Sequence, residues 1–194
     1  MVKVVKFGGS SLASADQFKK VGNIIRAEES RRYVVPSAPG KRFSEDTKVT
    51  DMLYKCYAEA EAGKNFDKQL KAIEERYNEI IKGLGLKLSL KEQFETIKKN
   101  FESKAGKDYA ASRGEYLNGI IPGFYGAMPN GEVKTFSRGG SDVTGSIVAR
   151  AIKADVYENW TDVSGFLAAD PRIVDNPRSI EVITYKELRE LSYM

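Results

Sequence analysis

The first forty residues alternate between short apolar runs and one amphipathic segment. An apolar run covers 2–7 and ends at two glycines. Ser14 with Gln17 three residues later has the pattern of a capping box, which marks the start of a helix. Apolar residues then recur at helical spacing, and a second apolar run follows at 33–37. Strand, glycine turn, helix and strand in this order predict a βαβ unit, and such units build parallel sheets.

The middle of the chain has a helical pattern from residue 48 to about residue 118. One helix face is marked by apolar residues at helical spacing: Phe66, Leu70, Ile73, Tyr77 and Ile80. Gly83 and Gly85 end that helix, and a last helix of this region is predicted over 108–118. Cys56 lies inside the pattern, and we expect it to be a buried small hydrophobe.

Beyond residue 118 the pattern returns to short strands. The predicted elements are strands at 120–125 and 132–136 around a turn at 129–131, a helix at 144–153, a strand at 156–160 and a loop-like stretch at 162–174. Thr184 with Glu187 forms a capping box for a final helix. The chain has 194 residues, and no repeat or low-complexity linker divides it. This length predicts one compact α/β domain.

Composition narrows the chemistry. The net charge of +4 is spread along the chain, which suits an anionic small substrate better than a nucleic acid. There is no histidine, the commonest general base and zinc ligand, and the single cysteine excludes an internal disulfide. The first apolar run is too short for a signal peptide and no stretch approaches a membrane span, so we expect a soluble cytoplasmic protein with no membrane partner.

The first candidate site is the string Lys6-Phe7-Gly8-Gly9-Ser10-Ser11 at the end of the first strand. A lysine supplies a point charge for phosphate, adjacent glycines let backbone amides approach phosphate oxygens, and the following helix adds its positive end. An ordinary tight turn between strand and helix would also favour glycine. The string is not a Walker A loop, and the motifs of protein kinases are absent.

The second is Ser137-Arg138-Gly139-Gly140-Ser141-Asp142-Val143-Thr144, a glycine-rich loop that leads into a helix. Arg138 and backbone amides can clamp a carboxylate or a phosphate, and Asp142 suits a positive partner or a metal. A simple helix cap at Ser141 or Asp142 is the alternative, although the string is more specific than a cap requires.

The third candidate lies just after the strand at 156–160, where open α/β sheets bind ligands. Thr161 and Asp162 could contact a nucleotide, and Arg172 its phosphates. The alternative is a loop built from the turn formers Ser164-Gly165 and Asp170-Pro171.

Together these strings resemble the aspartate kinases of the amino-acid kinase family. The strings that carry the resemblance occur in the family's order: Lys6-Phe7-Gly8-Gly9-Ser10-Ser11, Ser37-Ala38-Pro39-Gly40, Val49-Thr50-Asp51-Met52-Leu53, Arg113-Gly114-Glu115, Ser137-Arg138-Gly139-Gly140-Ser141-Asp142 and Trp160-Thr161-Asp162-Val163. The match runs from Val2 to about Arg172. No single motif is decisive, but the combination is highly specific.

The resemblance implies a three-layer α/β/α sandwich around a largely parallel sheet, here incomplete, with 1–194 as part of a catalytic domain. It implies ATP-dependent phosphorylation of the side-chain carboxylate of L-aspartate to 4-phospho-L-aspartate, the first step towards lysine, threonine and methionine. It also implies a homo-oligomer in the full-length enzyme. Magnesium is inferred from the nucleotide, and no residue is expected to be a metal ligand.

The resemblance also assigns roles to individual residues. The triphosphate site is expected from Lys6, Gly8, Gly9 and Ser10, the aspartate site from Thr50, Glu115, Arg138, Gly139, Gly140 and Ser141, and the nucleotide contacts from Thr161, Asp162 and Arg172. Arg138 is expected to clamp a carboxylate of aspartate. Asp142 is expected to order Lys6, which we place at a solvent-open phosphate site.

The chemistry of the residues agrees with these roles. A carboxylate acceptor is already ionised near neutral pH, so no histidine base is needed. The difficulty is repulsion between two anions, which Lys6, Arg138, backbone amides and magnesium can neutralise.

The sequence departs from the family at Asn118-Gly119, where relatives place further strand and helix, and it stops inside a helical pattern. Three hypotheses therefore remain. The chain is an aspartate kinase or its catalytic portion, a sister kinase of the same fold that acts on another carboxylate or carbamate, or a fragment that binds nucleotide without turnover.

Overall fold

The computed structural model describes residues 1–194 except 104–105, 119–124, 137–138, 164, 172 and 194. The chain divides into two compact units, Met1–Trp160 and Thr161–Met194, which are described separately. Within the described residues, no helix is long and apolar enough to cross a membrane.

The first unit is built on a three-stranded parallel sheet. Its strands are β1 (Lys3–Phe7), β2 (Arg31–Pro36) and β5 (Val156–Trp160), in the order β2-β1-β5. β1 pairs with both neighbours in parallel. The predicted βαβ unit is confirmed, with α1 (Ala15–Arg26) as its crossover and the Ser14 hydroxyl accepting a hydrogen bond from the Gln17 amide at 3.4 Å.

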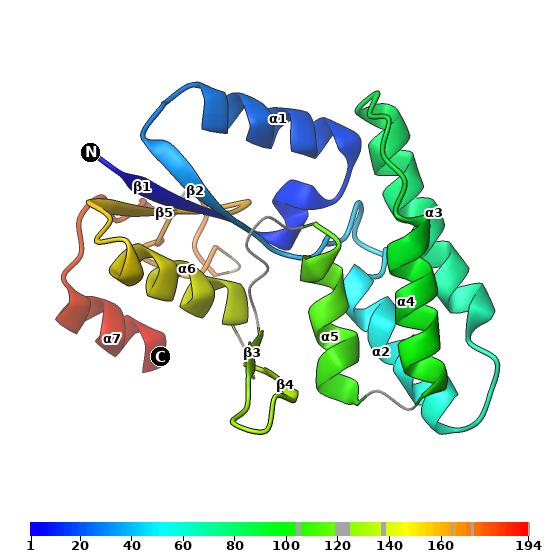
Figure 1. Ribbon diagram of the computed structural model, residues 1–194. Helices are drawn as coiled ribbons and strands as arrows, with labels where there is room; N and C mark the ends of the chain where they lie inside the picture. Colours follow the sequence, from blue (N-terminus) through cyan, green and yellow to red (C-terminus); the bar gives the residue numbers. More distant parts are fainter. Residues whose placement is uncertain (104–105, 119–124, 137–138, 164, 172, 194) are drawn as a thin grey trace. The chain divides into compact units, whose positions relative to one another are not determined.

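Helices cover both faces of this sheet, which gives the expected three layers (Figure 1). α1 lies on one face, where its apolar residues pack with those of β1 around Val5, Phe7, Leu12 and Val21. α6 (Gly140–Ala151) lies on the other face. Because side chains alternate along a strand, Lys6 faces α6 while Phe7 faces α1.

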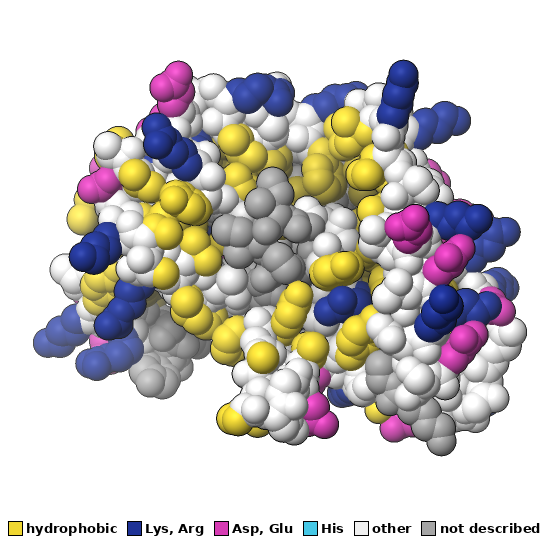
Figure 2. Space-filling model, viewed as in Figure 1, with side chains coloured by type: hydrophobic (Ala, Val, Ile, Leu, Met, Phe, Trp, Pro, Cys, Tyr) yellow, Lys and Arg dark blue, Asp and Glu magenta, His cyan; other side chains and the backbone are white. Residues whose placement is uncertain are grey.

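Four helices form a second core in the same unit: α2 (Val49–Glu61), α3 (Asp67–Gly83), α4 (Lys91–Glu102) and α5 (Lys107–Tyr116). Its buried residues include Leu53, Ile73, Phe94 and Phe101. Cys56 is fully buried there, as expected. Over the helices at the right of Figure 2, Lys and Arg side chains are interspersed with Asp and Glu, so this surface is not a concentrated basic face.

A short antiparallel hairpin is formed by β3 (Tyr125–Ala127), which shares only Tyr125 with the strand predicted at 120–125, and β4 (Val133–Thr135), which lies within the strand predicted at 132–136. Its turn needs Gly131, whose φ is +84°. Residues 120–124 of the first predicted strand lie outside the described residues.

The start of α6 was predicted too late, at residue 144, because the helix begins at Gly140. Gly139 is left-handed, with a φ of +59°, and its carbonyl accepts a hydrogen bond from the Val143 amide at 3.0 Å. The first turn of α6 therefore includes Ser141 and Asp142, which the sequence placed in a loop.

The second unit contains α7 (Tyr185–Tyr193). Its predicted capping box is confirmed, since the Thr184 amide donates to Glu187 at 2.9 Å and the Glu187 amide donates to the Thr184 hydroxyl at 3.3 Å. The described residues of 162–174 contain an isolated bridge at Leu167 but no helix or strand, in agreement with the loop-like expectation.

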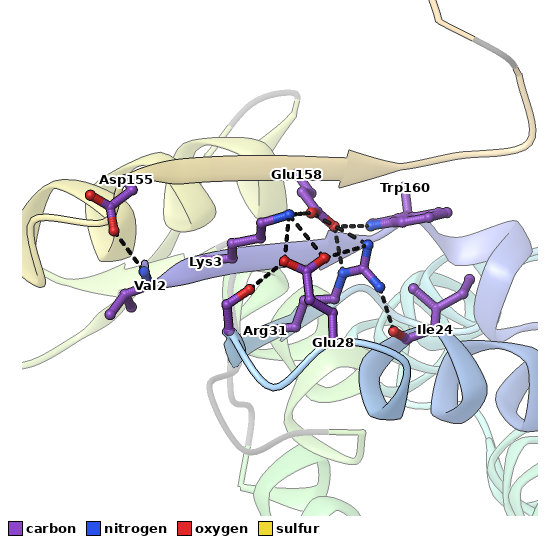
Figure 3. A network of polar contacts seen from close by, with 9 residues as sticks. Val2, Lys3, Ile24, Glu28, Arg31, Asp155, Glu158 and Trp160 are labelled. Atoms are coloured by element: carbon purple, nitrogen blue, oxygen red, sulfur yellow. Dashed lines mark hydrogen bonds and ion pairs between the residues drawn. The ribbon is translucent and has the colours of Figure 1, made fainter.

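A polar network joins the three strands on the sheet face that α1 covers (Figure 3). The Glu158 carboxylate accepts hydrogen bonds from Lys3 at 2.8 Å, from Arg31 at 2.9 Å and from the Trp160 indole at 2.8 Å. Lys3 also pairs with Glu28 at 2.8 Å. Burial by itself raises the pKa of Glu158, but the three hydrogen bonds outweigh burial and lower that pKa overall.

We expect Glu158→Gln to lower the free energy of unfolding at pH 7 by about 2 kcal/mol, because hydrogen bonds to a charged group are lost. The folded-state pKa of Glu158 lies below its ordinary value of 4.5. Its contribution is therefore present above pH 4.5 and is lost as pH falls through the folded-state pKa. Urea unfolding should show that the free energy of unfolding falls less between pH 7 and pH 3 in the variant than in wild type.

Glu75→Gln is the matched control, because Glu75 is exposed and pairs with Lys71 only at 3.9 Å. It should change the unfolding free energy by less than about 0.5 kcal/mol. An equal fall in the free energy of unfolding between pH 7 and pH 3 in wild type and Glu158→Gln would contradict the stabilising role of the ionised Glu158.

Candidate phosphate and substrate site

Two glycine turns meet back to back at the carboxyl ends of β1 and β2. The Gly40 amide donates to the Gly9 carbonyl at 2.7 Å, and the Gly8 amide donates to the Trp160 carbonyl at 3.0 Å. A Cβ on Gly40 would lie 2.6 Å from the Gly9 carbonyl carbon, and one on Gly9 would lie 2.8 Å from the Ala38 carbonyl oxygen. The close approach of these backbones therefore excludes side chains at both glycines.

Lys6 lies at this end of β1 and pairs with Asp142 of α6 at 2.9 Å. The expectation of a solvent-open Lys6 is wrong, because its residue exposure is 7%. Lys6 is on the sheet face that α6 covers, and its ammonium group reaches Asp142 in the first turn of that helix. Asp142 is 45% exposed, so the ion pair has one buried and one open member.

Asn159 completes this cluster from the neighbouring strand β5. It lies beside Lys6 in the parallel register and donates to the Asp142 carboxylate at 3.1 Å. Asp142 is therefore held from two strands at once. This agrees with its expected role of ordering Lys6, although that role stays a prediction.

Ser141, the neighbour of Asp142, links α6 to the turn that follows β2. The hydroxyls of Ser37 and Ser141 lie 2.9 Å apart, and the Asn118 amide donates to the Ser37 carbonyl at 2.7 Å. Ser141 is 8% exposed. The first turn of α6, which includes Gly140 and Ser141, also brings the positive end of a helix to this edge of the sheet, where it favours anions.

Thr50 lies in the first turn of α2, and Glu115 lies near the end of α5. The Val49 amide donates to the Pro39 carbonyl at 3.1 Å, which ties the start of α2 to the turn after β2. A Cβ on Gly114 would lie 2.7 Å from the Cβ of Ala38. The backbones on which Thr50 and Glu115 stand are therefore packed against one turn, while the Glu115 side chain lies outside the described residues.

Four further predicted residues are Arg138, Arg172, Thr161 and Asp162. Arg138 and Arg172 lie outside the described residues. Thr161 and Asp162 belong to the second unit, where both are exposed and the Thr161 hydroxyl accepts a hydrogen bond from the Val163 amide at 3.1 Å. Their assignment to the nucleotide stays a prediction.

A comparison with protein-family models identifies the family: the model described as the amino acid kinase family matches residues 1–194. The chain belongs to the amino acid kinase family. Among curated relatives it is 36% identical to aspartokinase 3 of Bacillus subtilis, over 99% of this chain and 55% of that protein. It is 32% identical to the aspartokinase of Rickettsia felis, over 97% of this chain and 51% of that protein.

Solved structures of amino acid kinases agree with the fold. The aspartate kinase of Clostridium acetobutylicum matches with a TM-score of 0.93 and 49% identity, over 99% of this chain and 55% of that one. Escherichia coli aspartokinase III, in complex with aspartate and ADP, matches with a TM-score of 0.81 and 24% identity, over 100% of this chain and 56% of that one. The second likeness concerns the fold alone.

The chain spans about half the length of the curated relatives it matches. The alignment with the Bacillus subtilis protein runs over 251 positions against 194 residues here, so at least 57 positions have no counterpart in this chain. This number does not say where the unmatched positions lie, so the expected departure at Asn118-Gly119 stays a prediction.

Three residues of the cluster were not assigned from the sequence: Ser37, Asn118 and Asn159. Ser37 stood inside a quoted family string at the end of a predicted strand, which was a usable signal. Asn159 required the knowledge that β5 lies beside β1, because only this register brings it next to Lys6. Asn118 required the packing of α5 against the turn after β2.

Among the described residues, no group of three His, Cys, Asp or Glu side chains could hold a metal ion by itself. Magnesium in nucleotide sites is usually held by substrate phosphates, water and one or two carboxylates. The donor set of the described residues suits only an ion that enters with a nucleotide, and Asp142 is the carboxylate paired with Lys6.

Proposed function

We propose that this chain is the nucleotide- and substrate-binding part of an aspartate kinase, which transfers the γ-phosphoryl group of ATP to the side-chain carboxylate of L-aspartate. The observation that carries the proposal is the Lys6–Asp142 pair at 2.9 Å, placed where a parallel strand ends beside two close-packed glycine turns. Similarity to aspartate kinases at 36% and 49% identity supports this choice of substrate.

The reaction needs charge neutralisation more than proton transfer. A carboxylate attacks a phosphoryl group, the bond to the β-phosphate oxygen breaks, and ADP leaves. Lys6 and the Gly9 amide would offset the charge on the transferred group, and magnesium bound with ATP would add to this. Asp142, held by Asn159, would keep the Lys6 ammonium on the line of transfer.

Aspartate would bind beside the turn after β2, against which the backbones that carry Thr50 and Glu115 are packed. Thr50 and Glu115 would take its ammonium and carboxylate groups, and Arg138 with the Gly139–Ser141 turn would clamp a carboxylate. Thr161, Asp162 and Arg172 would contact the nucleotide. We further propose that residues 1–194 belong to one catalytic domain of a cytoplasmic homo-oligomer.

The test is ADP release with MgATP, with L-aspartate compared against L-glutamate. We expect release that depends on aspartate, with kcat/KM for aspartate at least 100-fold above that for glutamate, because one extra methylene shifts the acceptor oxygen from the line of transfer. Turnover with glutamate, or with a carbamate, at the same efficiency would point instead to a sister kinase of the same fold.

A second candidate is favoured by the positions that the alignment leaves without counterpart. On this alternative the chain binds nucleotide but does not transfer phosphate. Titration calorimetry with MgADP and the ADP-release assay together distinguish the two functions, because the alternative predicts binding without any aspartate-dependent release of ADP.

A further inference from the structure

Helix α3 carries none of the residues assigned to aspartate or ATP. Two consecutive residues on it nevertheless form hydrogen bonds to the segments that lead to Thr50 and Glu115. Arg76 and Tyr77 are both buried, each at 3% exposure. Both direct polar groups at backbone carbonyls of other segments. A charged or hydroxyl group is costly to bury unless its contacts are specific, so these contacts require an explanation beyond the packing of an apolar core.

Arg76 binds both ends of the segment 40–47. Its guanidinium donates to the Thr47 carbonyl at 2.6 Å and also to the Gly40 carbonyl. It lies 3.4 Å from the Asp46 carboxylate, which Arg42 also binds at 2.8 Å. One planar side chain thus fixes the start and the end of this segment.

The segment that Arg76 fixes leads directly into the proposed substrate site. Gly40 closes the contact with the Gly9 turn at 2.7 Å, and the chain enters α2 two residues after Thr47. Thr50 lies in the first turn of that helix. A shift of residues 40–47 would therefore move Thr50 relative to the Gly8–Gly9 turn.

Tyr77 acts on the other substrate segment. Its hydroxyl donates to the Gly114 carbonyl at 2.8 Å, in a buried contact. Gly114 precedes Glu115 and packs against Ala38 with no space for a side chain. The two neighbouring side chains of α3 therefore reach the backbone beside Thr50 and the backbone beside Glu115.

We propose that Arg76 and Tyr77 are positioning residues that set the spacing between Thr50 and Glu115, and through it the affinity for the amino-acid substrate. This inference rests on the proposed function, in which those two residues bind aspartate. Neither Arg76 nor Tyr77 touches substrate itself; each acts through a backbone carbonyl.

The first test is steady-state kinetics of Arg76→Gln, Arg76→Lys and Tyr77→Phe. We expect Arg76→Gln to raise KM for aspartate at least tenfold while KM for ATP changes less than threefold. Arg76→Lys should recover part of the loss, because an ammonium still reaches one of the two carbonyls. Tyr77→Phe, which keeps the ring and removes only the hydroxyl, should raise KM for aspartate about threefold.

Arg42→Gln is the matched control. It removes a guanidinium from the same Asp46 carboxylate but touches neither the Gly40 nor the Thr47 carbonyl, so KM for aspartate should change less than twofold. Equal effects of Arg42→Gln and Arg76→Gln, or equal rises in both KM values, would overturn the inference. If Arg76→Gln does not fold, Arg76→Lys and Tyr77→Phe decide it by the same criteria.

Hydrogen–deuterium exchange separates this inference from the proposed function. In Arg76→Lys we expect the amides of residues 40–50, including Gly40 and Val49, to exchange at least tenfold faster than in wild type, with the amides of α1 unchanged. Absence of aspartate turnover in wild type would reject the proposed function alone. Unchanged exchange over 40–50 would overturn the positioning role, whatever the activity.

Discussion

Lys6→Met is expected to lower kcat for aspartate phosphorylation by about 10³-fold while the protein stays folded. The loss of one preorganised donor at a developing charge costs 10²–10³-fold in well-studied enzymes, and Lys6 is a buried cation beside the Gly8–Gly9 turn, where we propose that phosphate binds. Methionine keeps most of the buried volume. Asp142, 45% exposed, can be solvated once its partner is gone, so the free energy of unfolding should change by less than about 1 kcal/mol.

The matched control for this substitution is Lys19→Met, which makes the same change of charge on α1. Lys19 is 55% exposed and pairs only with Asp16 at 3.2 Å. Its kcat should stay within twofold of wild type. A folded Lys6→Met variant with wild-type kcat would remove Lys6 from the reaction.

Gly40→Ala is expected to lower the free energy of unfolding by about 2–3 kcal/mol, at the upper end of the roughly 1–3 kcal/mol that overpacking of a tight interior costs. Its Cβ would lie 2.6 Å from the Gly9 carbonyl carbon and 2.7 Å from the Ser10 amide nitrogen. These are backbone atoms, so no flexible side chain can move aside. The two turns would separate, and we expect kcat/KM to fall at least 100-fold, because small shifts at a reacting site are costly.

Gly106→Ala is the matched control for Gly40→Ala. A Cβ at Gly106 would meet no atom within 4 Å, and the φ of Gly106 is outside the left-handed region. It should leave activity unchanged and stability unchanged or slightly higher. Thermal denaturation and kinetics of both variants make the test. Equal stability of Gly40→Ala and wild type would contradict the close packing of the two turns.

Much of the fold followed from local pattern. The glycine pair after 2–7, the Ser14–Gln17 box and the apolar spacing of α1 together predicted a parallel βαβ unit, which β1, α1 and β2 confirm. The Thr184–Glu187 box was likewise predicted from two residues. Such signals are reliable because the hydrogen bonds they need lie within one turn of chain.

Features that depend on long-range packing were not predictable in this way. The burial of Lys6 depends on which sheet face α6 covers, and the place of Asn159 depends on β5 lying beside β1. The early start of α6 depends on Gly139 in the left-handed conformation, which the sequence permits but does not require. Arg76 belongs to no recognisable motif. The sequence predicted only the apolar face of its helix and gave no signal for the contacts of this arginine.

The most direct measurement is the identification of the acyl phosphate itself. The chain is incubated with MgATP, L-aspartate and hydroxylamine, and the trapped hydroxamate is analysed by mass spectrometry. An aspartate kinase yields the hydroxamate of the side-chain carboxylate in wild type and about 10³-fold less in Lys6→Met. A wild-type chain that binds MgADP but forms no hydroxamate, or forms it at the same rate with Lys6 removed, would contradict the proposed reaction at this site.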